Sequence, residues 1–222
     1  MDHHIFIDNS NIFFGIQGVA KRVEKHVPWA ALRLHFRNLA TLVEGGQTIV
    51  TRNLAGSVPP GNEELWRHAR EAGYDTNLLH KIEREDGRSG EQGVDEMLHL
   101  KIANLLLDAE RPGVLVLVTG DGGESEFGTS FPRQAQRARK RGWRVVVWSW
   151  KEQLSSVYAD LARFYDGGLS ANTLDQHYKS ITFVKGGMYG PPVTAKIVNL
   201  AERRAVPVRL PVRLAVTPTA GR

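Results

Sequence analysis

Apolar residues along this chain occur in two patterns: short continuous runs, and longer segments in which they recur at helical spacing. Continuous apolar runs bounded by turn residues are typical of strands in a parallel sheet that helices cover on both faces. The runs predict strands at residues 5–7, 47–54, 74–82, 114–118 and 144–150, with a short edge strand at 180–184.

Segments with helical spacing separate most of these runs. They predict helices at residues 29–43, 94–109, 131–141 and 154–165, and one that contains Trp66 and ends at Gly73. Alternating strands and helices indicate an α/β fold, namely a Rossmann-like, doubly wound, mainly parallel sheet with helices on both faces.

The last part of the chain has a different composition. Glycines and prolines near residue 187 predict a boundary between a domain at 1–186 and a basic, proline-containing tail at 187–222. Because Pro207 and Pro211 exclude a central strand, we expect the segment 206–214 to be an extended arm.

Composition narrows the chemistry. The chain has 222 residues, 41% of them hydrophobic, and no cysteine, so disulfides, thiolate metal sites and cysteine nucleophiles are excluded. The net charge is +5, but the tail holds six basic residues and one acidic residue, which leaves 23 of each in the body. No apolar run approaches the roughly 20 residues that cross a membrane, and the first residues lack a basic leader, so we expect a cytoplasmic protein with no membrane partner.

Two aspartates each follow a predicted strand. Asp8 comes directly after the run at 5–7, and Asp121 follows the run at 114–118. In doubly wound sheets the first strand commonly neighbours the fourth, so these two carboxylates are expected to face each other at the switch point, where ligands bind. Asp95, at the start of the helix 94–109, is a third candidate, although an acid there also stabilises the helix by itself.

A cluster of carboxylates needs a proton, a base or a cation nearby. Oxygen ligands suit Mg²⁺ or Mn²⁺. A dinucleotide fingerprint fails because Ser125 stands at its third glycine position, and no phosphate-binding P-loop is present. A metal-dependent adhesion site of the von Willebrand A type is a minor alternative. That site needs a second serine at the position where this chain has Ile12.

Three motifs together resemble the NYN domain, a family of PIN-like nucleases. They are Asp8-Asn9-Ser10-Asn11, then Gly93-Val94-Asp95, then Thr119-Gly120-Asp121-Gly122, and the likeness covers roughly residues 3 to 185. The resemblance implies cleavage of RNA phosphodiester bonds that depends on Mg²⁺ or Mn²⁺, with Asp8, Asp95 and Asp121 as ligands. It also implies that Asn11 orients a ligand and that Thr119 supports the strand end.

One position departs from the family. Many members have a second acid two residues after the last aspartate, where this chain has Gly123. Glu124 is our first choice as its replacement and Glu126 the second.

Basic residues beside the acids predict the substrate track. They are Lys81, Arg84 and Arg88 before Asp95, and Arg133 and Arg137 on the helix after Asp121. Such residues contact phosphates without reading sequence. The leading hypothesis is therefore a metal-dependent ribonuclease whose partner is RNA, with single-stranded DNA and a homodimer as further possibilities. The alternative is a catalytically weak NYN-like module that binds RNA or a protein.

Overall fold

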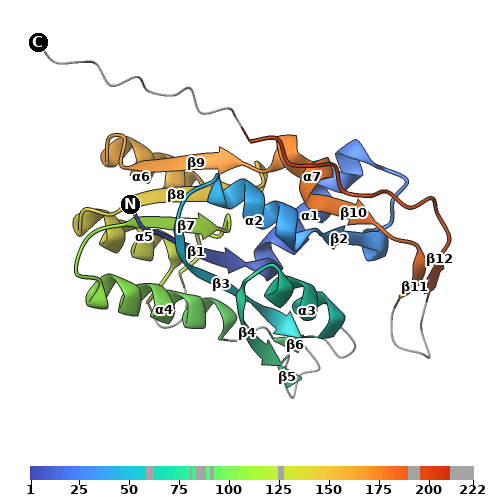
Figure 1. The fold of residues 1–222 in the computed structure, drawn as a ribbon, viewed down its shortest axis with the longest axis horizontal. Coiled ribbons are helices and arrows are strands. Elements are labelled where there is room, and N and C mark those ends of the chain that lie inside the picture. Colours follow the sequence, from blue (N-terminus) through green and yellow to red (C-terminus); the bar gives the residue numbers. More distant parts are fainter. Residues whose placement is uncertain are drawn as a thin grey trace, which may run out of the picture.

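A six-stranded sheet of parallel strands forms the centre of the protein (Figure 1). The computed structural model describes residues 1–58, 63–80, 82–83, 89–90, 93–124, 128–189 and 196–210. The strand order is β4-β3-β1-β7-β8-β9, so the chain starts in the middle, builds one half outward, and then returns to build the other half. The strands are β1 (His3–Asp8), β3 (Ile49–Val58), β4 (Asp75–His80), β7 (Val114–Val118), β8 (Arg144–Ser149) and β9 (Leu169–Thr173).

This arrangement confirms the α/β fold that the pattern predicted. β1 pairs with β3 on one side and with β7 on the other, each in parallel register. Because the strand order reverses at β1, the crevice at the carboxyl ends of β1 and β7 is the switch point of the sheet.

Two hydrophobic cores cover the two faces of the sheet. Along β1, Ile5 and Ile7 enter one core and Phe6 enters the other, as the alternation of side chains in a strand requires. The first core is covered by α1 (Asn9–Val23), α2 (Phe36–Glu44) and α3 (Glu63–Glu71). The second is covered by α4 (Val94–Asp108), α5 (Phe131–Lys140) and α6 (Ser156–Phe164).

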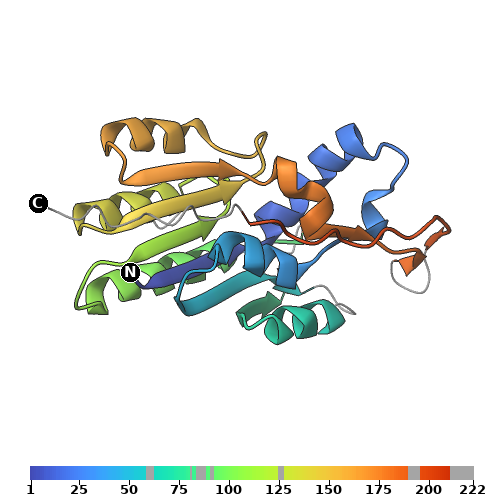
Figure 2. The same ribbon diagram turned by 45° about the horizontal axis from the view of Figure 1, so that its top comes forward.

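Several smaller elements gather beyond the carboxyl ends of the strands, where α1 also lies (Figure 2). There β2 (Leu32–Leu34) pairs with β10 (Thr182–Val184), and β11 (Gly187–Tyr189) pairs with β12 (Lys196–Val198), both antiparallel. The short helices η1 (Trp29–Ala31), η2 (Asp175–His177) and α7 (Tyr178–Ile181) complete this end. At the edge of the molecule, β5 (Ile82–Glu83) pairs with β6 (Ser89–Gly90).

Two expectations about the elements were wrong, and one strand of the main sheet was not expected. The helix expected at 29–43 begins only at Phe36, because His35 caps it and Leu32–Leu34 form a strand instead. The segment at 180–184 does not lie at the edge of the main sheet, since β10 pairs with β2 in a separate sheet. The edge position belongs to β9, a strand whose sequence Leu-Ser-Ala-Asn-Thr has no apolar run.

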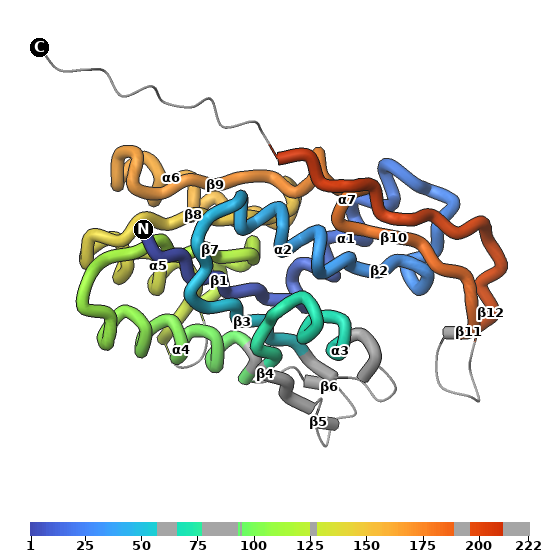
Figure 3. Tube along the Cα trace, in the orientation of Figure 1, coloured from blue at the N-terminus to red at the C-terminus, as the bar shows by residue number. Residues whose placement is uncertain are grey.

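The C-terminal segment returns over the domain. Residues 196–210 run back along α7 and α2 (Figure 3). The backbone N–H of Val206 donates to the carbonyl of Lys179, and the Asn38 amide donates to the carbonyl of Val206. The part of the predicted arm that is described, 206–210, has no helix or strand, whereas 211–214 lies outside the described residues.

Candidate active site at the carboxyl ends of β1 and β7

Asp8 is the last residue of β1 and the N-cap of α1. Its side chain is 3% exposed. Its Oδ1 accepts from the backbone N–H of Asn11 at 3.0 Å, a bond that satisfies one of the free donors at the start of α1. Its Oδ2 accepts from the hydroxyl of Thr119 at 3.1 Å. The carboxylate is therefore fixed by both the helix that follows β1 and the strand beside it.

Thr119 and Asn11 connect the two strand ends. Thr119 Oγ1 donates to Asp8 and accepts from the backbone N–H of Asp121 at 3.2 Å. Asn11 Oδ1 accepts from the backbone N–H of Gly120 at 2.8 Å. These bonds hold the loop after β7 against the start of α1, so the sequence motifs around Asp8 and Asp121 meet at the switch point.

Gly120 has no room for a side chain. A Cβ at this position would collide with the carbonyl of Gln153 and with the hydroxyl of Ser149. The loop therefore passes close to the backbone after β8, an approach that only glycine permits.

Asp121 lies half-buried in this loop. Its Oδ1 accepts from the backbone N–H of Gly123 at 3.0 Å, and its carbonyl accepts from the Tyr158 hydroxyl at 2.8 Å. Burial raises the pKa of Tyr158, and the charges of Asp121 and Asp8 raise it further. Tyr158 therefore stays protonated and acts as a donor that holds the loop.

Gly123 stands at the position where the resemblance implies a second acid. A Cβ added there would lie 3.3 Å from Asp121 Oδ1. A side chain at this position would therefore start beside the Asp121 carboxylate.

Asp95 and Glu96 lie in the first turn of α4, which starts at Gly93 with a positive φ of 96°. Both are half-buried. One turn further, His99 is 2% exposed, and neither ring nitrogen has a hydrogen-bond partner. Its ring packs edge-on against Phe131 with the centroids 4.4 Å apart. Burial lowers the pKa of His99, whereas the charges of Glu96 and Asp121 oppose that shift, which relates the first turn of α4 to the Asp121 loop.

The sequence interpretation missed His99. It found no ligand spacing among the histidines themselves. The signal that could have identified this residue is its spacing of three and four residues from Glu96 and Asp95, which puts all three on one side of α4.

The predicted fourth ligand, Glu124, forms an ion pair with Arg133 at 3.0 Å, and both side chains are about half exposed. Exposed pairs of this kind contribute little to stability, so the pair constrains Glu124 only weakly. Arg137 lies one turn beyond Arg133 on the exposed side of α5. Other basic residues of this helix have structural roles, since Arg139 binds the Trp143 carbonyl and Arg141 binds the Leu106 carbonyl.

Four predicted site residues, Lys81, Arg84, Arg88 and Glu126, lie outside the described residues. Within the described part of the chain, no group of three or more histidine, aspartate or glutamate side chains is gathered closely enough to hold a metal ion. Thr119 links the carboxylate of Asp8 to the backbone of Asp121, so these two aspartates lie on neighbouring strand ends. Their use as ligands stays a prediction.

The structure therefore defines a Rossmann-like α/β domain with two aspartates, Asp8 and Asp121, at its switch point. The NYN domain family model matches residues 3–168, so the chain belongs to the NYN domain family. This family is generally nuclease-like, and nucleases of this kind generally use divalent metals. The prediction of the family and of its fold is therefore confirmed.

The chain is similar in fold to solved structures over most of its length. A crystal structure of a protein of unknown function, VPA0982 from Vibrio parahaemolyticus, aligns with a TM-score of 0.56 at 16% identity, covering 78% of this chain and 94% of that one. This likeness shows the fold alone. A PLP-bound protein from Clostridium difficile aligns with a TM-score of only 0.29 at 6% identity, covering 78% of this chain and 46% of that one, which carries no weight. No curated protein matches the chain.

No helix in the described ranges is both long and apolar enough to cross a membrane.

Proposed function

We propose that this protein is a metal-dependent ribonuclease that hydrolyses RNA phosphodiester bonds at the carboxyl ends of β1 and β7. The observation that carries the proposal is the hydrogen-bonded link between Asp8 and the Asp121 loop through Thr119 and Asn11. Asp8 is buried, and a buried carboxylate is costly unless it is paired, while the carboxyl ends of strands at a switch point are where ligands bind.

The residues present fit a magnesium or manganese ion. Asp8 and Asp121 offer carboxylate oxygens, the ligands that both ions prefer. Magnesium is commonly bound through one or two carboxylates together with waters and substrate phosphates, so a pair of aspartates suffices. Asp8 and Asp121 would hold the ion, and Asp95, which the structure does not gather with them, would become a third ligand only if the first turn of α4 moved toward the ion. When bound, the ion would lower the pKa of a water and stabilise charge on a phosphoryl oxygen.

The other residues of the site act by positioning. Asn11 and Thr119 fix the loop that carries Asp121. The Tyr158 hydroxyl donates to the backbone carbonyl of Asp121 and holds the same loop. Glu124 would approach the ion once its ion pair with Arg133 opens, and Glu126, which lies outside the described residues, is the second choice for this role. Opening this ion pair would also free the Arg133 guanidinium to contact a phosphate of the substrate. The same event would therefore supply a carboxylate to the ion and a cation to the RNA.

The substrate track follows from the exposed cations and one exposed aromatic ring. Arg133 and Arg137 on α5 would contact phosphates, as would Lys81, Arg84 and Arg88. Phe14 is 60% exposed and lies one helical turn after Asn11, which contacts the Asp121 loop. An exposed ring so close to the cleavage site can stack an unpaired base. We therefore propose single-stranded RNA as the substrate, and single-stranded DNA as a second one.

The test is cleavage of a 5′-labelled single-stranded RNA in Mn²⁺, in Mg²⁺ and in EDTA. The native protein should cleave in either metal and not in EDTA, and Asp121→Asn should be inactive. Asp108→Asn is the matched control, because Asp108 is exposed at the far end of α4. Equal cleavage by the native protein and Asp121→Asn would refute the mechanism.

A second candidate function rests on Gly123, which takes the place of the expected acid. It is a module that binds RNA with little or no cleavage. Tight binding of the same RNA by the native protein, without cleavage in either metal, would favour this alternative.

A further inference from the structure

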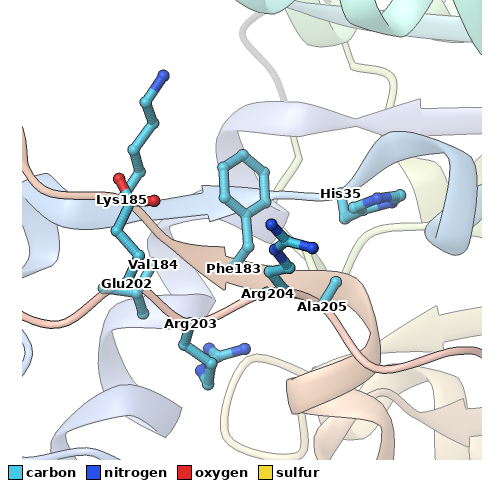
Figure 4. Close-up of a pocket in the computed structure, with 8 residues that line it drawn as sticks. All are labelled: His35, Phe183, Val184, Lys185, Glu202, Arg203, Arg204 and Ala205. Carbon is cyan, nitrogen blue, oxygen red and sulfur yellow. The ribbon is translucent and has the colours of Figure 1, made fainter.

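A pocket of about 400 Å³ lies away from the acidic site, between α2, β10 and the returning segment 202–205 (Figure 4). It is an open depression in the surface rather than an enclosed cavity, so a ligand bound there would stay partly exposed to solvent. One of its lining residues, Arg203, is bonded to Glu24 at the C-cap of α1, whereas Asp8 caps the other end of this 15-residue helix. The two sites are therefore about one helix length apart, roughly 22 Å.

The wall of the pocket carries an aromatic ring. In β10, Thr182 and Val184 are buried, so Phe183 between them points to the opposite side and is half-buried. Its ring meets that of His35 nearly at right angles, with the centroids 6.2 Å apart. An aromatic face that the protein leaves partly uncovered can stack on a flat ligand.

His35 contributes a hydrogen-bond donor to the pocket, its ring Nε2–H. It caps α2, and its Nδ1 accepts from the backbone N–H of Asn38 at 3.2 Å. Burial lowers the pKa of His35, so the ring is neutral near pH 7. Because Nδ1 is used as an acceptor, the proton of the neutral ring lies on Nε2.

Two neighbouring arginines point in different directions. Arg203 turns inward, where its Nε and Nη2 donate to the Glu24 carboxylate at 2.7 and 2.9 Å. Arg204 is exposed and points away from Arg203, toward the side of the pocket that Phe183 and His35 line (Figure 4). Among the described residues no carboxylate pairs with Arg204. At the rim, Lys185 and Glu202 bring charges of opposite sign.

We propose that this pocket binds a nucleotide, with the base stacked on Phe183 and the phosphate held by Arg204. A planar base suits the ring, and the His35 Nε2–H supplies a donor for an acceptor on the ligand. The guanidinium is an ion that recognises phosphate by paired hydrogen bonds. The same chemistry is offered by a free mononucleotide and by the terminal nucleotide of an RNA strand.

The test uses the Asp121→Asn protein in EDTA, so that neither cleavage nor metal affects the result. Binding of AMP is measured by isothermal titration calorimetry, with adenosine and ribose 5-phosphate as partial ligands. We expect saturable binding of AMP, and weaker binding of each partial ligand. Phe183→Leu and Arg204→Gln should each weaken AMP binding at least about fivefold, because each removes one half of the recognition.

Matched controls keep the result interpretable. Phe183→Tyr keeps the ring, and Arg209→Gln removes an exposed arginine from the same returning segment. Both should bind AMP like the parent protein, and thermal melting should show that all variants are folded. Absence of AMP binding, or equal binding by Phe183→Leu and the parent, would overturn the proposal.

A single-stranded A6 oligonucleotide separates the two sources of nucleotide. If the pocket takes the end of a strand, A6 competes with AMP and loses affinity in Arg204→Gln. If it takes free mononucleotides, AMP binding depends on Arg204 and A6 does not compete. Both results support the pocket, and neither depends on whether the acidic site cleaves RNA.

Discussion

Asp121 and Glu24 are two carboxylates near opposite ends of α1, and the protein treats them differently. Glu24 is nearly buried and accepts from both the Arg203 guanidinium and the Tyr178 hydroxyl. Asp121 accepts from the backbone N–H of Gly123, and no cation among the described residues pairs with it. A carboxylate matched by a guanidinium serves the fold, whereas one held only by backbone dipoles keeps its charge available for a cation.

The largest expected effect is on catalysis. Asp121→Asn should lower the rate of RNA cleavage in Mn²⁺ by a factor of about 100 or more, because the transition state loses much of its electrostatic stabilisation. The same change should leave the melting temperature equal or higher, since it removes a charge from the neighbourhood of Asp8. A fall in melting temperature as large as that of a core mutation would mean that Asp121 belongs to the fold, and the contrast with Glu24 would be lost.

Glu24→Gln should act on stability. It leaves Arg203 without its charged partner in a nearly buried position, and we expect the free energy of unfolding to fall by about 3 kcal/mol. Chemical denaturation followed by circular dichroism measures this. The double variant Glu24→Gln with Arg203→Met should recover part of the loss. If the single change costs nothing, the returning segment 196–210 is not held by this pair.

Gly123→Asp tests what the departure from the family means. The new side chain would start 3.3 Å from Asp121 Oδ1 and add a ligand. We expect the affinity for Mn²⁺ to rise about tenfold, measured by calorimetry without RNA. Gly123→Asn, which adds a side chain of the same size without the charge, is the control. If both variants bind Mn²⁺ like the native protein, position 123 lies outside the ion's reach.

The smallest effect concerns pH. Burial holds the pKa of His99 below its ordinary value of 6.5, so below that pH the unfolded chain takes up a proton that the folded ring resists. Stability should therefore fall as the pH drops from 7 toward 5. His99→Leu should flatten this slope and change stability at pH 7 by no more than about 1 kcal/mol, because it removes an unpartnered polar group. An unchanged slope would show that His99 is not protonated on unfolding in this range.

The main sheet could be predicted because its central strands are continuous apolar runs. β9 could not, because an edge strand needs no such run, and α1 was missed because it starts with Asn9, Ser10 and Asn11. Gly15 also weakens the helical pattern of α1. A glycine is needed at this position because a side chain there would collide with Trp150.

The candidate site was predictable in part. Asp8 and Asp121 followed from their positions after strands, and the link through Thr119 and Asn11 agrees with the expected neighbouring of β1 and β7. The ion pair of Glu124 with Arg133 could not be predicted, because side-chain pairing on a surface depends on loop geometry. The pocket lined by His35, Phe183 and Arg204 could not be predicted either, because these residues come from three separate segments of the chain.

The link between Thr119 and Asp8 joins residues 111 positions apart in the chain. Contacts of such long range are slow to form, because a large loop must close before they contribute stability. β1 cannot gain its second neighbour until β7 has folded beside it, and the bond from Arg203 to Glu24 spans 179 positions. Because β1 also pairs with the earlier strand β3, only its second edge and the link from Thr119 to Asp8 depend on the later half of the chain, so we expect the candidate site to be completed after the first half of the sheet has formed.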